Sequence, residues 1–255
     1  MNQDDRRKYL IEGLLKERPE YENIQIPSDA GEQKMLLRSL MNIRMPGEMD
    51  DVFLHVQDAY LIEENRKKGI VTLADIREVQ PDLSIWKGDI TRLKVGAIVN
   101  AANSGMTGCY QPCHNCIDNC IHTYAGIQLR NYCNDMMIKQ RHEEATGQAK
   151  ITPAFNLPCD YVIHTVGPIV RGKLKKEHER LLISCYESCL RIADENEVKS
   201  IAFCCISTGV FMFPNKRAAE LAVQTVKQYK EKTKIKVIFN VFKEEDERLY
   251  KQLLR

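Results

Sequence analysis

The chain has 255 residues, of which 44% are hydrophobic, enough to bury a substantial core and too many for a disordered chain. Its 37 lysines and arginines nearly balance 35 aspartates and glutamates, and the net charge of +2 gives no strong field to attract nucleic acid or an anionic membrane. No apolar run approaches the ~18 residues of a membrane span, and the first residues lack an apolar signal segment. We therefore expect a cytoplasmic protein with neither nucleic-acid nor membrane partners.

Residues 1–80 predict a helical N-terminal extension. Apolar residues at helical spacing indicate three helices, with breaks near Pro19, Pro46 and Gly69. The residues expected on their apolar faces are Leu10, Leu14 and Leu15, then Leu36, Leu37, Leu40 and Met41, then Val52, Val56, Ala59 and Tyr60. Each helix has one apolar face only, so the extension is expected to pack on the rest of the chain.

Residues 81–255 alternate short strands with helices. The strand candidates are 83–87, 97–101, 161–165, 200–206 and 235–241, which are rich in β-branched or aromatic residues and bounded by turns. Helices are expected at 118–133, 178–194 and 216–230, the first with Ile121, Ala125, Leu129 and Tyr132 on one face. This alternation predicts a three-layer α/β sandwich.

Four of the ten cysteines fall within twelve residues: Cys109, Cys113, Cys116 and Cys120. Without a secretory signal they do not indicate a disulfide framework. Thiolates and an imidazole in one short loop are typical zinc ligands, and the tightest set is Cys109, His114 and Cys116. Cys113 stays open as a fourth ligand, whereas Cys120, inside a predicted helix, is more typical of a core residue. A redox role for Cys113 and Cys116 lacks the preceding thioredoxin-like strand.

The number of ligands decides the role of the metal. Four protein ligands would make a closed structural site, whereas three leave a position for water or substrate. The open site is favoured by Asp118 and Asn103 nearby, because a carboxylate beside such a metal makes chemical sense.

Two other loops follow predicted strands. Residues 99–103 (VNAAN) are small or carry carboxamides, so backbone can approach a ligand there; a plain asparagine-capped turn is the alternative. Residues 207–214 (STGVFMFP) can present several N–H groups to a phosphate, with Phe211 and Phe213 as candidates to cover a base or ribose. The alternative is an ordinary connection with buried aromatics.

These loops, in this order, resemble the macrodomain family of ADP-ribose-binding proteins. The matching stretches are Gly88–Thr91, Ile98–Asn103, Ile117–Asp118 with Ile121–His122 and Ala125–Gly126, Thr146–Ala149, Val162–Pro168 and Ile206–Gly209. The resemblance implies a three-layer α/β/α macrodomain with a mixed central sheet over residues 81–255.

The main departure from the common family pattern is the segment CYQPCHNC, which replaces a run of glycines. In this respect the chain resembles the zinc-containing macrodomain branch of microbes, which also has a helical N-terminal extension. That resemblance implies one zinc ion, held by two cysteines and one histidine, and removal of mono-ADP-ribose from modified protein side chains, acidic residues being the expected acceptors. It further implies a sirtuin-like transferase as the opposing enzyme and a lipoyl-carrier protein as the modified partner.

Carried over by position, the resemblance implies a role for each motif residue. Asp89 would accept a hydrogen bond from the adenine amine beside Ile90, Asn103 would hold the distal ribose, and Asp118 would be the carboxylate at the anomeric carbon. The diphosphate would be wrapped by Ser207, Thr208, Gly209 and Val210, and Phe213 would flank the distal ribose. Met212 departs from the glycine of many relatives. His122 and His164 match family positions, but are more typical of core residues.

Three other functions compete with hydrolysis. A non-catalytic reader of ADP-ribose would use the same binding residues, but would gain little from an open metal position beside the ribose. A structural zinc knuckle for nucleic acid is disfavoured by the small net charge and the lack of a basic, aromatic-interleaved patch. A phosphatase acting on an ADP-ribose phosphate ester is the remaining alternative.

Overall fold

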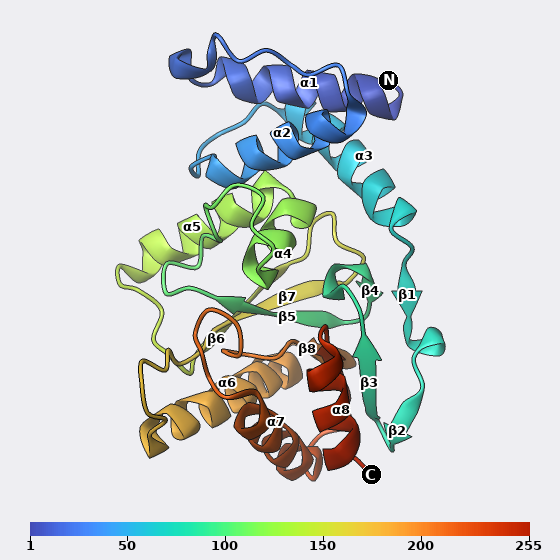
Figure 1. Ribbon diagram of the computed structural model, residues 1–255, viewed down its shortest axis with the longest axis vertical. Coiled ribbons are helices and arrows are strands. Elements are labelled where there is room, and N and C mark those ends of the chain that lie inside the picture. Colours follow the sequence, from blue (N-terminus) through green and yellow to red (C-terminus); the bar gives the residue numbers. More distant parts are fainter.

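A seven-stranded sheet forms the centre of the computed structural model, which describes all residues from 1 to 255 (Figure 1). Its strand order is β2-β3-β9-β8-β5-β7-β6. In chain order the strands are β2 (Glu78–Gln80), β3 (Leu83–Lys87), β5 (Ala97–Ala102), β6 (Ala149–Pro153), β7 (Tyr161–Val166), β8 (Ser200–Phe203) and β9 (Lys236–Val241). The five inner strands pair in parallel, and the two edge strands, β2 and β6, are antiparallel to their neighbours. The predicted mixed sheet is therefore confirmed.

The parallel strands bring several distant segments to one edge of the sheet. Because β3, β5, β7, β8 and β9 run the same way, the segments that follow them all begin at the carboxyl edge, where ligands of open α/β sheets bind. Two contacts join these segments directly: Gly88 N donates to Val241 O, and Val170 N donates to Phe211 O. The motif loops found in the sequence consequently lie along the same edge of the sheet.

Helices cover both faces of the sheet (Figure 1). Helices α4 (Ile117–Ala125) and α5 (Ile127–Gln140) lie on one face, and α6 (Lys176–Glu195), α7 (Asn215–Lys230) and α8 (Glu244–Leu253) lie on the other. The helices expected at 178–194 and 216–230 correspond to α6 and α7, and each buries an apolar face that includes Leu182 and Cys189 in α6 and Ala222 and Val226 in α7. The three-layer α/β/α arrangement is thus confirmed.

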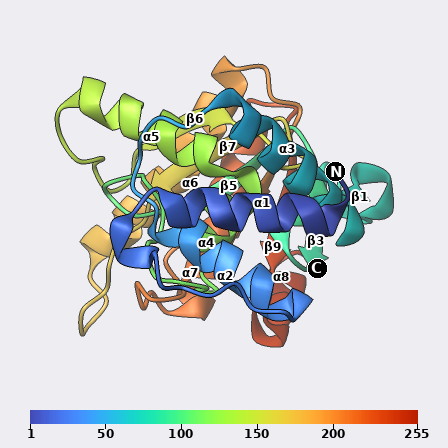
Figure 2. The same ribbon diagram turned by 90° about the horizontal axis from the view of Figure 1, so that it is seen from above.

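The N-terminal helices form a further layer outside α4 and α5 (Figure 2). They are α1 (Gln3–Lys16), α2 (Ala30–Ile43) and α3 (Asp51–Lys67), and the side chains of Asn2, Asp29 and Asp50 cap their N-termini. Their buried residues form a second hydrophobic core that also takes in Ile127 of α5. None of the helices in the molecule is both long and apolar enough to cross a membrane.

The third helix buries a different face from the one expected. Val52 is 62% exposed, whereas Phe53, Gln57 and Leu61 are buried with Tyr60. Gln57 is buried because its side-chain oxygen accepts the N–H of Ile127 at the start of α5, over 3.0 Å. The spacing of apolar residues does not predict this face, because one of its members, Gln57, is polar.

The single helix expected at 118–133 is two helices, α4 and α5, separated by Gly126. This glycine has φ +100°, and a Cβ there would come within 2.7 Å of Gln57 Nε2. Because the chain changes direction here, Tyr132, which was expected to be buried, is 43% exposed.

Four short strands were not expected. Strand β1 (Val71–Thr72) pairs with β4 (Leu93–Lys94) in a separate two-stranded sheet, and β6 is an edge of the main sheet. Strand β2 lies inside residues 1–80, so the central sheet begins within the range that was expected to be helical. The strand expected at 200–206 ends at Phe203, and the remaining residues belong to the following turn.

Candidate active site and metal centre

The three predicted metal ligands lie together in the segment between β5 and α4. The ligand atoms of Cys109, His114 and Cys116 are all within 4.8 Å of one another, and Cys109 Sγ lies 3.7 Å from His114 Nδ1. Two thiols and an imidazole are donors that zinc prefers, so the chemistry of this set fits that ion. Burial raises the pKa of the Cys116 thiol to about 12, and a thiolate at that position therefore requires a positive charge beside it.

The other two cysteines of the cluster point elsewhere. Cys113 Sγ lies 3.2 Å from Ser39 Oγ and 3.5 Å from Met35 O, both on α2. Cys120 Sγ lies 3.6 Å from a guanidinium nitrogen of Arg38. Neither thiol belongs to the group of three, so the geometry favours the three-ligand set.

Asp118 stands in the first turn of α4, two residues after Cys116, and is only 5% exposed. Asn100 Nδ2 donates to Asp118 Oδ1 over 2.8 Å, and Asn103 Nδ2 donates to Asp118 Oδ2 over 3.3 Å. Both asparagines come from the end of β5, so Asn103, expected near Asp118, contacts it directly, and Asn100 is an additional partner. Burial raises the pKa of Asp118 to about 6, although these hydrogen bonds and the charge of Arg130 act in the opposite direction.

Behind Asp118 lies a buried pair of histidines. His122 Nε2 is 3.6 Å from Asp118 Oδ1, and neither nitrogen of that ring has a hydrogen-bond partner. His164 contacts Asn100 Nδ2 and Thr152 Oγ1, each over 3.1 Å, and burial lowers its pKa to about 3. Both side chains are buried, as expected of core residues, and burial favours the neutral form of His164.

The segment expected to hold adenine follows β3. Asp89 Oδ1 accepts hydrogen bonds from the backbone and hydroxyl of Thr91, and Asp89 Oδ2 lies 3.3 Å from Lys68 Nζ. Partial burial would raise the pKa of Asp89, but Lys68 and Thr91 together lower it. Ile90 is 4% exposed and belongs to the core. Phe242, 75% exposed, directly follows Val241, whose carbonyl accepts Gly88 N, so an exposed aromatic ring emerges beside this segment.

The loop after β8 has most of the free N–H groups that were expected of a phosphate-binding turn, but Thr208 N donates to Cys205 O over 3.4 Å. The backbone N–H groups of Ser207, Gly209, Val210 and Phe211 make no hydrogen bond within the chain. Ser207 has φ +65° and a buried hydroxyl without a partner, a strained conformation of the kind found where a backbone faces a ligand. The arrangement can accept an anion.

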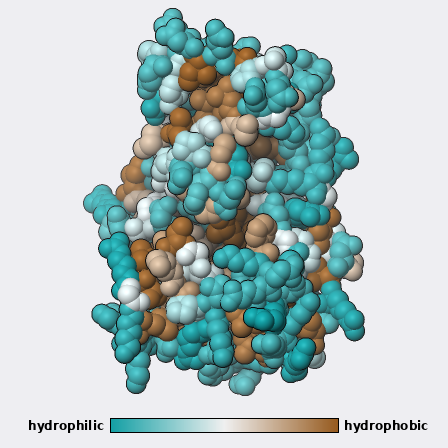
Figure 3. Space-filling model, in the orientation of Figure 1, coloured by the Kyte–Doolittle hydropathy of each residue, from teal (hydrophilic) through white to brown (hydrophobic).

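The aromatic residues of this loop differ in position. Phe213, which was expected to flank the distal ribose, is 1% exposed and lies in the main core, so its ring supports the loop from its buried side. Phe211 is half-buried, and Val210 and Met212 are each 72% exposed. On the face of the molecule shown in Figure 3, apolar residues are visible in a recess in the middle, below the helical extension.

Comparison with known proteins places this geometry in a family. Residues 99–222 match the family model described as Macro domain. A protein-ADP-ribose hydrolase of Treponema medium is 60% identical over the full length of both chains. This chain belongs to the macrodomain family. A protein-ADP-ribose hydrolase of Staphylococcus aureus (strain MSSA476) is 46% identical over 97% of this chain and 94% of its own length.

Two solved macrodomain structures share the fold. That of Oceanobacillus iheyensis with ADP is 34% identical, with a TM-score of 0.63 over 70% of this chain and 93% of the other. That of Trypanosoma brucei in complex with ADP-ribose is 26% identical, with a TM-score of 0.67 over 86% of this chain and 95% of the other. ADP and ADP-ribose are both ligands of the nucleotide type expected from the motifs.

Two site residues were not predicted from the sequence, namely Phe242 and Lys68, which contacts Asp89 from the end of α3. Asn100 lies in the predicted segment 99–103, but its contact with Asp118 from inside a buried strand was not predicted. Only Phe242 had a local signal, since it is an aromatic residue directly after the strand at 235–241, in the same position relative to its strand as the motif loops.

Proposed function

We propose that this macrodomain removes a single ADP-ribose from modified protein side chains, using a zinc ion held by Cys109, His114 and Cys116. One observation carries the proposal: three zinc-type donors lie directly before the helix whose first turn presents Asp118. The names of the full-length relatives support a hydrolase that acts on ADP-ribose linkages. Zinc, when bound, would supply a Lewis acid at the sugar end of the cleft.

The chain's own residues suffice to hold the nucleotide end of the ligand. Asp89 would accept the adenine amine, and the exposed ring of Phe242 would stack on the base. The free N–H groups of Ser207, Gly209, Val210 and Phe211 would bind the diphosphate. These contacts fix the ligand along the carboxyl edge of the sheet, with its distal ribose toward Asn103.

Asp118 would act on the attacking water. Its carboxylate is held by Asn100 and Asn103, so it is oriented before substrate arrives. Asp118 would take a proton from water while the water oxygen forms a bond to the anomeric carbon. The bond from that carbon to the side-chain oxygen of the modified protein breaks, and the released acid carries away the electron pair. Asn103 would hold the ribose hydroxyls during this step.

The finer features of the proposal rest on the family resemblance. These are the acidic side chain in the linkage, the sirtuin-like transferase that installs the modification, and the lipoyl-carrier protein that bears it. A non-catalytic reader remains the competing function, and it makes the opposite prediction for product release.

The test is release of ADP-ribose from a protein that is mono-ADP-ribosylated on an acidic side chain. The parent should release it. Asp118→Ala should release it about 10²- to 10⁴-fold more slowly, the range for loss of a general base, while binding free ADP-ribose within about threefold of the parent. Asp135→Ala, on the exposed side of α5, is the control and should match the parent. Parent-rate release by Asp118→Ala would exclude this role, and no release by any form would indicate a reader.

A further inference from the structure

Helix α2 of the N-terminal extension contacts the metal-binding loop directly. One guanidinium nitrogen of Arg38, Nη2, donates to the main-chain carbonyl of His114 over 2.7 Å and to Asn119 Oδ1 over 3.0 Å. His114 is one of the three candidate ligands, and 76 residues separate it from Arg38 in the chain. The N-terminal extension therefore contacts the backbone of the loop that would hold zinc.

Asn119 extends this contact to the other two ligands. Its side chain is fully buried, and Nδ2 donates to Cys109 O over 3.3 Å and to Gln111 O over 2.9 Å. Its backbone N–H lies 3.4 Å from Cys116 Sγ. Because Arg38 holds the oxygen of the Asn119 amide, the amide nitrogen must face the loop carbonyls. Arg38 and Asn119 together thus hold all three ligand positions.

The next turn of α2 holds the middle of the loop. Asn42 Oδ1 accepts the backbone N–H of Cys113 over 2.9 Å, and Ser39 Oγ lies 3.2 Å from Cys113 Sγ. Cys113 has φ +52°, a left-handed conformation that is costly for a residue with a side chain. The contacts from α2 compensate for this local cost.

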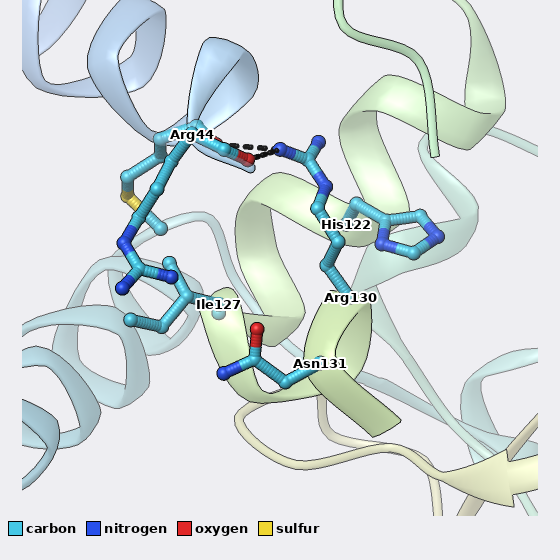
Figure 4. A pocket seen from close by; sticks show the side chains of 7 residues that line it. Arg44, His122, Ile127, Arg130 and Asn131 are labelled. Atoms are coloured by element: carbon cyan, nitrogen blue, oxygen red, sulfur yellow. Dashed lines mark hydrogen bonds between the residues drawn. The ribbon is translucent and has the colours of Figure 1, made fainter. Parts of the chain in front are cut away.

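Helix α2 is itself fixed to the domain by a buried arginine of α5. Arg130 Nη1 donates to the carbonyls of Met41, Asn42 and Arg44 at the end of α2, over 2.6–3.1 Å. Figure 4 shows this guanidinium directed at the end of α2, beside a small cavity that is also lined by His122 and Ile127. Arg130 Nε donates to Thr107 O, two residues before Cys109. The helix and the loop are therefore tied to the same buried group.

We infer that Arg38 is a positioning residue for the metal centre, through which helix α2 preorganises Cys109, His114 and Cys116 for zinc. The inference rests on the proposed function in that these three residues bind the ion. A loop that is already held in its binding conformation loses less conformational freedom when the ion binds. Groups that orient metal ligands in this way typically contribute 10- to 100-fold to metal affinity.

The test measures zinc affinity instead of activity. Full-length protein is stripped of metal and titrated with zinc against a chromophoric chelator of known affinity. Arg38→Met should bind zinc at least about tenfold more weakly than the parent. Lys34→Met is the matched control, because it removes a positive charge from the same helix and Lys34 pairs only with Glu64 of α3. It should bind zinc like the parent.

A second variant separates positioning from a loss of folding. Arg38→Lys keeps a charged donor but not the planar fork, and its zinc affinity should lie between those of the parent and Arg38→Met. The unfolding midpoints of the zinc-free proteins show whether each variant is folded. If Arg38→Met does not fold, the test is the comparison of zinc affinity between Arg38→Lys and Lys34→Met. Zinc affinity equal to that of the control in both Arg38 variants would overturn the inference. A parent that binds no zinc would overturn both the inference and the metal-dependent function.

Discussion

The ammonium group of Lys68 lies 3.3 Å from the carboxylate of Asp89 and 3.1 Å from Thr91 Oγ1, and so connects the end of α3 with the segment expected to bind adenine. The same ammonium lies over the ring of Tyr124 on α4, 2.8 Å from its centroid. Partial burial lowers the pKa of Lys68, and Asp89 acts in the opposite direction. The Asp89 carboxylate, which would bind adenine, is thus held by Lys68, a residue from outside the strands of the cleft.

Replacement of Lys68 should weaken ADP-ribose binding. In Lys68→Met the Asp89 carboxylate keeps its bonds to Thr91 but loses its charged partner, and we expect about fivefold weaker binding by calorimetry. Lys67→Met is the matched control, since Lys67 pairs only with Glu63 and Glu64 on its own helix. Binding as tight as that of the parent in Lys68→Met would show that Asp89 needs no such support.

The zinc content of cysteine variants tests the ligand set. Cys109→Ser and Cys116→Ser should lose stoichiometric zinc, because each removes one of three donors that lie within 4.8 Å of one another. Cys113→Ser should retain about one zinc per chain, because its sulfur faces Ser39 and Met35 on α2. Elemental analysis of the purified proteins measures this. Loss of zinc from Cys113→Ser alone would point to a different set of ligands.

A methyl group at Gly108 should destabilise the fold. Gly108 has φ +86°, and a Cβ there would lie 2.7 Å from the ring of His122. Strain and clash together predict that Gly108→Ala lowers the free energy of unfolding in urea by about 2 kcal/mol or more. At Gly47, where no atom lies within 4 Å of an added Cβ, the same substitution should change stability by less than about 0.5 kcal/mol. Equal effects at the two glycines would contradict this description of the turn before Cys109.

His164 should make stability depend on pH in a defined direction. A histidine in the unfolded chain has a pKa of about 6.5, whereas burial lowers the pKa of folded His164 to about 3. As pH falls, the histidine is protonated in the unfolded chain before it is protonated in the folded protein. The contribution of neutral His164 to the free energy of unfolding is therefore full above about pH 6.5 and declines toward pH 3. Asp118 acts in the opposite sense, because its raised pKa makes protonation favour the fold.

Comparison with His164→Asn isolates that contribution. Between pH 7.5 and 5.5 the parent should lose about 1.4 kcal/mol more unfolding free energy than the variant, as measured by urea denaturation. Asp118 is present in both proteins, so its effect largely cancels. A difference between the two proteins that stays constant over this range would show that His164 is not held neutral.

The parts of the fold that were predicted correctly are those with a strong local pattern. Strand β3 was predicted with its observed bounds and β5 ends one residue later than expected, because both are short apolar runs between turns. The predictions failed where tertiary contacts override the pattern. Gln57 is buried because it caps another helix, and Gly126 interrupts a continuous amphipathic pattern.

The candidate site shows the same division between features that local patterns predict and features that depend on tertiary contacts. The proximity of Cys109, His114 and Cys116 followed from their spacing, since a short loop can close on itself. The contacts of Arg38 and Lys68 with the site could not be predicted, because each residue lies on the face of a helix whose docking depends on the whole fold. Phe211 and Phe213 were both candidates to cover the ligand, because the loop sequence alone does not reveal which of the two aromatic rings enters the core.

The most direct test of the metal-dependent function follows ADP-ribose release from mono-ADP-ribosylated protein through removal and return of zinc. We expect release by the zinc-loaded enzyme, loss of release after chelation to less than about a tenth of a zinc per chain, and recovery when one equivalent of zinc is restored. Undiminished release by the chelated enzyme would contradict the assignment of a catalytic metal to Cys109, His114 and Cys116.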